Sequence, residues 1–221
     1  VRPAVNFGER VDVERADILL LHYTGMASEQ GALDWLCCQE SGVSCHYFVR
    51  TSGEVVQLVS EVHRAHHAGV GSWEGHRDIN SRSIGIEIAN HGHDGGLPDF
   101  PKLQMIAVSY LCRDIISRLD IQPRHVLGHS DIAPKRKQDP GEQFDWIWLY
   151  DQQVGHYVEP AKITAGTFFQ RGDAGEPIVA LQSMLALYGY EVEVSGEFDD
   201  LTHFAVLGFQ RHFRPQCVDG I

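Results

Sequence analysis

The amino-acid sequence predicts an α/β fold in which a mixed central β-sheet is flanked by helices, followed by a small all-α domain. The run Ile18-Leu19-Leu20-Leu21 is continuously apolar, which is typical of a buried central strand. Strand patterns then alternate with helical patterns up to about residue 150, as in α/β domains. Beyond residue 167 the clear patterns are helical, which indicates a separate helical unit.

The first third of the chain predicts one helix and one hairpin around that strand. Residues 1–16 are polar and mixed, and we interpret them as an arm leading into the sheet. Ser28–Gln39 has helical spacing of its apolar residues and begins with a residue that caps helices. Residues 45–50 and 55–59 are β-rich runs separated by a turn signal at 51–54, which predicts a β-hairpin.

Two loops surround the next predicted strand. Residues 62–80 are rich in His, Gly and Trp without periodicity, and a loop of that length in a compact domain is more often functional than idle. Ser83–Ile88 alternates strictly, so its three isoleucines should face one side while Gly85 and Glu87 face the other. A second glycine-rich loop follows at 91–100.

The domain should end with a helix, a short strand and an aromatic segment. Residues 124–128 predict a short strand that leads directly to His129, and the aromatic run 144–149 is interpreted as closing the domain. The preceding helix is predicted over 103–119, with a buried stripe of Leu103, Ile106, Ala107, Tyr110, Leu111, Ile115 and Leu119.

We expect three parts: a first domain of residues 1–151, a linker of residues 152–167 and a helical domain of residues 168–221. The helical domain contains helix patterns at 179–188 and 200–213, the second preceded by an aspartate that can cap it. Two short helices cannot bury a core alone, and the sequence ends where a third would begin. We therefore expect this domain to be incomplete at its C-terminus.

Composition limits the classes of function. The chain has 221 residues, of which 43% are hydrophobic and 22% charged, an ordinary globular balance that excludes a disordered protein. No apolar run approaches the ~20 residues of a membrane helix. The net charge of -12 argues against nucleic acid as a partner, because nucleic-acid binding usually requires clustered Lys and Arg. Five cysteines without a C-x-x-C pair are expected to be free thiols.

The stretch His129 to Gly141 has the composition of a metal site. It combines the imidazole of His129, the ammonium of Lys137 and the carboxylate of Asp139, and its prolines and glycine keep it out of a long helix. Catalytic zinc usually has three protein ligands. His129 and Asp139 supply two of them, so a third ligand must come from elsewhere in the chain. His22, at the end of the predicted central strand, opens onto a cleft and is the best candidate. We predict a Zn2+ site formed by His22, His129 and Asp139.

Three ordered motifs make residues 17–148 resemble the zinc-dependent N-acetylmuramoyl-L-alanine amidases of bacteria: His22-Tyr23-Thr24, the strand Ser83 to Asn90, and His129 to Gly141. Phage members and recognition proteins of the family carry cysteine where Asp139 stands, so the resemblance is to the bacterial branch. Residues 166–221 resemble the three-helix peptidoglycan-binding domain, through Gly172, Leu181-Gln182, Gly189-Tyr190, Gly196-x-Phe198-Asp199, Thr202 and Phe209-Gln210.

The resemblance implies roles for individual residues. It supports the three metal ligands and assigns Glu87 and Lys137 to catalysis, as general base and as oxyanion stabiliser. We also predict His67 and Asn80 to bind substrate. The reaction implied is hydrolysis of the amide between N-acetylmuramic acid, in its ordinary or 1,6-anhydro form, and L-alanine. Peptidoglycan fragments or the sacculus would be the partners, in cell-wall turnover or recycling.

Simpler interpretations stay open at this stage. Outside the family pattern, Glu87 would be a salt-bridged strand residue and Lys137 a solvated surface charge, and loop histidines such as those at 66, 67, 91 and 93 are commonly solvated or hydrogen-bonded. Two other functions are a non-catalytic peptidoglycan recognition protein and a zinc peptidase acting on stem peptides. A wall-binding domain favours the periplasm or cell envelope, whereas unpaired cysteines and the missing signal favour the cytoplasm.

Overall fold

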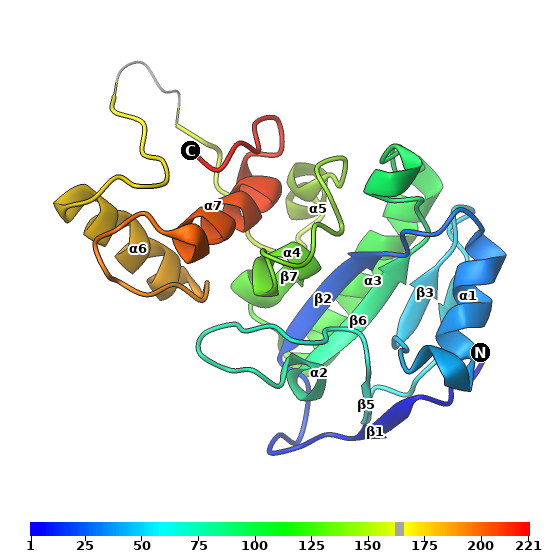
Figure 1. The fold of residues 1–221 in the computed structure, drawn as a ribbon. Helices are drawn as coiled ribbons and strands as arrows, with labels where there is room; N and C mark the ends of the chain where they lie inside the picture. Colours follow the sequence, from blue (N-terminus) through cyan, green and yellow to red (C-terminus); the bar gives the residue numbers. More distant parts are fainter. Residues whose placement is uncertain (162–165) are drawn as a thin grey trace.

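The computed structural model describes residues 1–161 and 166–221. Its centre is a five-stranded sheet in which β2 pairs in parallel with β6 and β7, β3 pairs in parallel with β6, and β3 and β4 form the antiparallel hairpin. The mixed sheet that the sequence predicts is confirmed (Figure 1). In spatial order its strands are β4 (Val55–Gln57), β3 (Tyr47–Val49), β6 (Ser83–Ile88), β2 (Ile18–Tyr23) and β7 (Val126–Gly128).

Strand β2 is the buried central strand, as predicted. Residues 18–21 are fully buried, because β6 and β7 cover both edges of the strand and packed elements cover both faces. The parallel register pairs Leu20 with Gly85 and His22 with Glu87. Side chains alternate along a strand, so these four residues belong to one face of the sheet.

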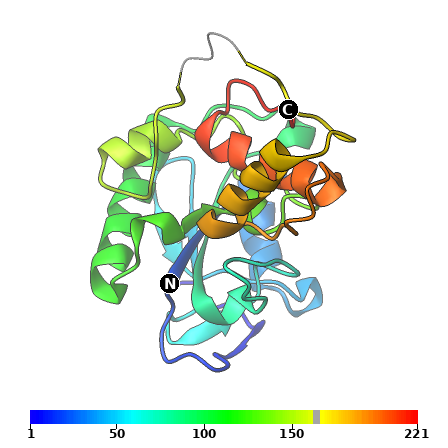
Figure 2. The same cartoon turned by 90° about the vertical axis from the view of Figure 1, so that its left-hand side faces the viewer.

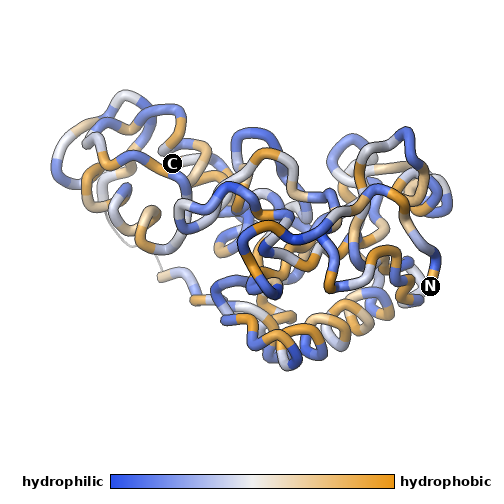
Figure 3. Tube along the Cα trace, turned by 90° about the horizontal axis from the view of Figure 1, so that it is seen from below, coloured by the Kyte–Doolittle hydropathy of each residue, from blue (hydrophilic) through white to orange (hydrophobic). Residues whose placement is uncertain are grey.

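The other face is covered by α3 (Lys102–Leu119) and α5 (Trp146–Asp151), which pack on the isoleucines of β6. The predicted buried stripe of α3 is confirmed at Ile115, which is fully buried, but wrong at Leu103 and Tyr110, which are 65% and 64% exposed. The buried face instead includes Gln104, whose amide donates to the carbonyls of Val49 and Ala89. Because this buried residue is polar, the buried face of the helix cannot be recognised from its apolar pattern in the sequence. Along the helices, hydrophobic and hydrophilic residues alternate (Figure 3).

Helices from both ends of the chain cover the face that carries His22. Helix α1 (Glu29–Cys37), capped by Ser28 as predicted, lies beside the hairpin. The short helix α4 (His129–Ile132) and the C-terminal helices α6 (Glu176–Tyr188) and α7 (Asp200–Phe213) lie at the β7 edge. The N-terminus is at the α1 end of the molecule and the C-terminus at the opposite end (Figures 1 and 3).

The two C-terminal helices share their core with the sheet, and they lie on the side of the molecule that faces the viewer in Figure 2. Both are confirmed, although α6 begins three residues before the predicted start, with a proline in its first turn. Two short helices cannot bury a sufficient core by themselves, and α6 and α7 bury their apolar faces by packing on the larger part of the chain. One apolar cluster contains Ile18, Leu20, Trp73, Leu127 and Ile132 from the first part and Ile178, Leu185, Tyr190, Phe198, Ala205 and Val206 from the second.

The division of the chain at residues 151 and 167 stays a prediction. Residues 162–165 of the predicted linker lie outside the described residues. The described part before them contacts the C-terminal helices, since His156 bonds the hydroxyl of Tyr188 and Tyr157 stacks on Phe213.

Short elements occur where the sequence predicts irregular chain. β1 (Phe7–Glu9) lies in the predicted arm and pairs with β5 (His63–Ala65), which lies in the predicted loop together with α2 (Ile79–Arg82). Elements of three or four residues are too short to show a period. Single helical turns complete the fold as η1 (Gln39–Ser41), η2 (His93–Gly95) and η3 (Pro123–His125). Among the described helices, none combines the length and the apolarity needed to span a membrane.

The shared core predicts that the full chain unfolds in one transition. Phe198→Ala should cost about 3–5 kcal/mol, as expected for a buried aromatic, whereas Phe168→Ala should be nearly neutral because Phe168 is 66% exposed. All four tryptophans precede residue 151, but Trp73 packs against Tyr190 and Trp146 stacks on His212, so their fluorescence reports on the unfolding of either part. If Phe198→Ala gives two separate fluorescence transitions, one of them at the wild-type melting temperature, the two parts unfold independently.

Candidate metal centre

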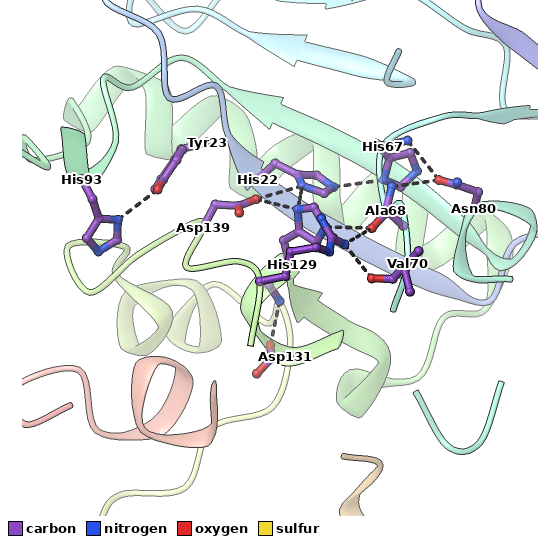
Figure 4. A network of polar contacts seen from close by, with 12 residues as sticks. His22, Tyr23, His67, Ala68, Val70, Asn80, His93, His129, Asp131 and Asp139 are labelled. Atoms are coloured by element: carbon purple, nitrogen blue, oxygen red, sulfur yellow. Dashed lines mark hydrogen bonds and ion pairs between the residues drawn. The ribbon is translucent and has the colours of Figure 1, made fainter. Parts of the chain in front are cut away.

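Three donor atoms converge at the C-terminal end of β2. The Nδ1 atoms of His22 and His129 are 2.9 Å apart, and each lies 3.0 Å from Oδ2 of Asp139 (Figure 4). All three side chains are buried. In a tetrahedral zinc site with bonds of ~2.0–2.1 Å, neighbouring ligand atoms are about 3.3–3.4 Å apart, so only small movements separate this arrangement from a coordination sphere. The three predicted ligands therefore come together.

The chain geometry around His129 explains why two ligands ten residues apart meet. His129 follows β7 directly as the first residue of α4. The backbone N–H of Ser130 donates to the carbonyl of Asp139 at 2.9 Å, which closes the segment between the two ligands into a loop. Gly128 permits this closure, because an added Cβ there would lie 2.7 Å from Cδ of Pro140.

A backbone carbonyl fixes the tautomer of His129. Its Nε2 lies 2.9 Å from the carbonyl oxygen of Ala68, which can only accept, so Nε2 carries the proton and Nδ1 presents a lone pair. Arg136 donates to the same carbonyl at 2.8 Å and to that of Val70 at 2.6 Å, which holds this loop against the ligand segment. Such outer contacts typically orient metal-binding imidazoles.

A chain of hydrogen bonds orients His22. Nε2 of His22 is 3.0 Å from Nδ1 of His67, and Nε2 of His67 is 3.3 Å from the hydroxyl of Ser83, which donates to the carbonyl of Ile79. Since the hydroxyl proton is used there, Ser83 accepts from His67, and His67 accepts from His22. Gly85 leaves room for this ring, because a Cβ there would lie 2.5 Å from it.

Asn80 lies behind the centre and not in the cleft wall. Its side-chain oxygen accepts from the backbone N–H groups of His67 at 3.0 Å and of Ala68 at 2.9 Å. It therefore fixes the dipeptide that contacts both metal-site imidazoles, one through the His67 ring and the other through the Ala68 carbonyl. His67 itself borders the cleft, as predicted.

The convergence of donors calls for a cation. Burial, together with the neighbouring His129, lowers the pKa of His22 from 6.5 to about 4, so His22 is neutral near pH 7. Burial raises the pKa of Asp139, but positive charge on the adjacent imidazoles would lower it well below its usual range, and a bound cation would supply that charge in their place. Two imidazole lone pairs and one carboxylate that face each other in a dry site are favourable only around a positive ion.

Glu87 lies on the same face, in register with His22. One of its carboxylate oxygens is buried without a hydrogen-bond partner among the described residues. Burial and the nearby Asp139 carboxylate raise its pKa well above the usual range, while the charge of Lys137 opposes them. A cation held by the three ligands would act on Glu87 in the same direction as Lys137 does. An unpaired carboxylate facing a cleft is a candidate base.

The centre opens into a cleft of about 310 Å3 that Glu87 and Lys137 also border, so all five predicted metal and catalytic residues meet there. One wall comes from α1 and the segments on either side of it, where the sequence gives no functional signal because the side chains are apolar. Its lining residues include Met26, Ala32, Trp35, Leu36 and Val43.

The other histidines considered from the sequence have different partners. His93 bonds the hydroxyl of Tyr23 at 3.0 Å and the carboxylate of Glu142 at 2.7 Å. His46 accepts from the backbone N–H of Gly85 and contacts the carbonyl of His63, so it is a structural residue. Sequence reasoning missed the Ala68 carbonyl and Arg136 as outer contacts. A backbone carbonyl carries no side-chain signal, and Arg136 was visible only as the middle residue of the basic cluster Lys135-Arg136-Lys137.

Comparison with known families agrees with this geometry. Residues 12–142 match the N-acetylmuramoyl-L-alanine amidase family and residues 174–221 match a peptidoglycan binding domain family. The N-acetylmuramoyl-L-alanine amidase AmiD of Escherichia coli K12 is 34% identical over 225 residues, which cover 93% of this chain and 78% of that protein.

Two solved structures share the architecture of the whole chain. AmiD from E. coli, in complex with anhydro-N-acetylmuramic acid-L-Ala-D-gamma-Glu-L-Lys, has a TM-score of 0.77 at 30% identity and covers 97% of this chain and 91% of its own. AmpDh3 from Pseudomonas aeruginosa, in complex with anhydromuramic pentapeptide, has a TM-score of 0.73 at 28% identity, with 100% and 90% covered.

The geometry predicts one divalent metal ion per chain. Replacing His22, His129 or Asp139 by Ala should remove the ion, because two ligands do not retain it against a chelator. His66→Ala is the matched control, since His66 borders the same cleft but is not one of the three donors, and it should keep the metal. Metal content measured after gel filtration checks this. Full metal content in all three ligand variants would place the site elsewhere.

Proposed function

The chain belongs to the N-acetylmuramoyl-L-alanine amidase family, and on this premise we propose that it uses zinc to separate N-acetylmuramic acid from L-alanine in peptidoglycan fragments. The observation that carries the proposal is the convergence of the His22, His129 and Asp139 donor atoms in a cleft that also contains Glu87 and Lys137. Such an activity would act in turnover or recycling of the cell wall.

Zinc fits the donor set. Two neutral imidazoles and one carboxylate match its preferences, and three protein ligands leave a fourth position for water or substrate. When bound there, zinc would lower the pKa of water and polarise the scissile carbonyl. The outer contacts made by Ala68 and His67 support the ring orientations that binding requires.

Glu87 is the proposed general base. Glu87 borders the cleft from the strand next to His22, one of its carboxylate oxygens is unpaired among the described residues, and its raised pKa favours taking a proton. It would accept the proton of the attacking water and return it to the departing amino group of L-alanine, so that the proton balance closes within one residue. General acid–base catalysis of this kind typically contributes about 10²–10⁴-fold.

Lys137 is the proposed stabiliser of negative charge. It lies two residues before Asp139, lines the cleft, and its charge acts on both His22 and Glu87. The carbonyl oxygen of the scissile amide gains negative charge as water adds, and an ammonium beside it lowers the energy of that state more than that of the substrate.

His67 and Asn80 divide between binding and positioning in this proposal. His67 borders the cleft and hydrogen-bonds His22, so it can contact substrate while it orients a ligand. Asn80 is one layer deeper, and its bonds to the backbone of His67 and Ala68 support a positioning role instead of substrate contact.

We also propose a division of labour along the chain. Residues 1–151 would carry the zinc amidase chemistry, since every proposed ligand and catalytic group lies between His22 and Asp139, and residues 168–221 would add affinity for polymeric peptidoglycan. A second attachment raises the effective concentration of enzyme at a polymer surface. Because the related structures hold anhydromuramic peptides, muropeptides with a 1,6-anhydro sugar are the first substrates to test.

Glu87→Gln should keep the metal but lower kcat by at least about 10²-fold, because the amide cannot accept a proton.

The product pattern tests the proposed function. For the wild-type chain, mass spectrometry of muropeptides, ordinary and 1,6-anhydro, should find free muramic-acid sugars and intact stem peptides after incubation with enzyme. Released amino acids with the sugar–peptide bond intact would identify a peptidase. Unchanged muropeptides with the metalated wild-type chain would identify a recognition protein.

Lys137→Ala should lower kcat about 10²–10³-fold with little change in KM, because charge stabilisation operates mainly in the transition state. Lys135→Ala is the matched control, since Lys135 belongs to the same basic cluster but is absent from the cleft lining. Steady-state kinetics on one muropeptide measures both. An effect confined to KM would make Lys137 a substrate-binding residue.

A further inference from the structure

Helix α7 of the C-terminal part packs directly on the segment that carries two of the three proposed ligands. Gly208 marks the point of closest approach, because a Cβ at this position would lie 2.7 Å from the carbonyl oxygen of Ser130 and 3.0 Å from Cβ of Pro134. Only glycine lets the helix reach the backbone one residue after His129.

A buried carboxylate ties this contact together. Asp131, two residues after His129, accepts from the backbone N–H of Gly128 at 2.7 Å, which anchors it within its own segment. From the C-terminal part it receives the hydroxyl of Tyr190 at 2.6 Å and Nδ1 of His212 at 2.8 Å. Asp131, Tyr190 and His212 are 1%, 3% and 2% exposed, so solvent does not screen these interactions.

Arg211, the residue before His212 in α7, contacts the C-terminal end of the same ligand segment. Nε of Arg211 donates to Oε1 of Glu142 at 2.9 Å, and Glu142 stands three residues after Asp139. The other oxygen of Glu142 bonds His93, whose second nitrogen contacts the hydroxyl of Tyr23 in the cleft wall. Adjacent residues of one helix thus bond to the chain just beyond each of the two ligands.

We infer that α7 and Tyr190 form a brace that positions the metal-ligand segment 129–142, so that the C-terminal part acts in the metal site as well as in any binding of polymer. The inference rests on the proposed metal centre. The brace consists of Gly208, Tyr190, Arg211 and His212, and it acts through Asp131 and Glu142 without touching the metal or the substrate.

The segment needs an external support. Helix α4 has only four residues and the rest of the segment has no regular structure, so neither ligand stands on a long, self-supporting element. A ligand set that is free to spread loses metal affinity, because part of the binding energy must then order the chain.

Two tyrosines at the same contact provide a matched test in the full-length protein. Tyr190→Phe removes the hydroxyl that donates to Asp131 and keeps the ring. Tyr188→Phe removes a hydroxyl that bonds His156 in the same aromatic cluster and touches nothing in the ligand segment. We expect Tyr190→Phe to raise the dissociation constant for Zn2+ about 10-fold, the lower end for outer contacts of metal ligands, and Tyr188→Phe to leave it within about twofold.

A second pair tests the other end of the segment. Arg211→Gln breaks the ion pair with Glu142 and should weaken Zn2+ binding by a similar factor, while Arg211→Lys should restore part of it. Arg77→Gln is the control, because the Arg77 side chain pairs with Glu191 across the same two parts of the chain and has no hydrogen bond or ion pair to the ligand segment. In the Co2+-substituted protein, the visible absorption bands should change in Tyr190→Phe and Arg211→Gln and stay as in wild type in both controls.

The outcomes separate the brace from the proposed function. If the wild-type chain binds no zinc, the metal centre itself is wrong. If wild type binds one zinc but Tyr190→Phe and Arg211→Gln match their controls in affinity and Co2+ spectrum, the brace is overturned and the contacts only stabilise the fold. Coupling is reciprocal, so zinc should also slow hydrogen exchange in α7 of the wild-type chain, and unchanged exchange would likewise contradict the inference.

Discussion

The convergence of three lone-pair donors on one point is the constraint on which the rest of the structure depends. Each group loses its hydration when it is buried, and their mutual repulsion adds to that cost. The fold offsets part of this cost by hydrogen-bonding the second nitrogen of each imidazole. Nε2 of His129 bonds the carbonyl of Ala68, and Nε2 of His22 bonds the ring of His67. Rotation of either ring would break such a bond in a dry environment. The site is therefore preorganised by its outer contacts before any ion enters.

The order of the strands explains why these groups can meet. In a parallel pairing the carboxyl ends of adjacent strands lie at one edge, so β2, β6 and β7 deliver His22, Glu87 and His129 to the same place. Glu87 reaches it from within its strand because the register sets it opposite His22. Only Asp139 arrives by loop closure.

The sequence predicts the parts of this arrangement that depend on local pattern. The apolar run of β2 and the alternation of β6 identify the strands, and the types and spacing of the donors identify the ligands. It could not predict the face of α3, because Gln104 is buried for the sake of two strand carbonyls, nor the role of Ala68, which acts through its backbone. Such contacts depend on tertiary neighbours and leave no period or motif.

The C-terminal part shows the same limit on a larger scale. Helical pattern and family resemblance describe it as a module, and both of its helices form, α7 with the predicted bounds and α6 with an earlier start. Pattern alone does not say what a helix packs against. Its apolar face joins the sheet core, and its polar residues Arg211 and His212 reach carboxylates beside the metal ligands. A buried ion pair repays its desolvation only with good geometry, so such contacts specify orientation more than they add stability. The polar contacts of α7 are thus better suited to fixing the position of the ligand segment than to joining two independent modules.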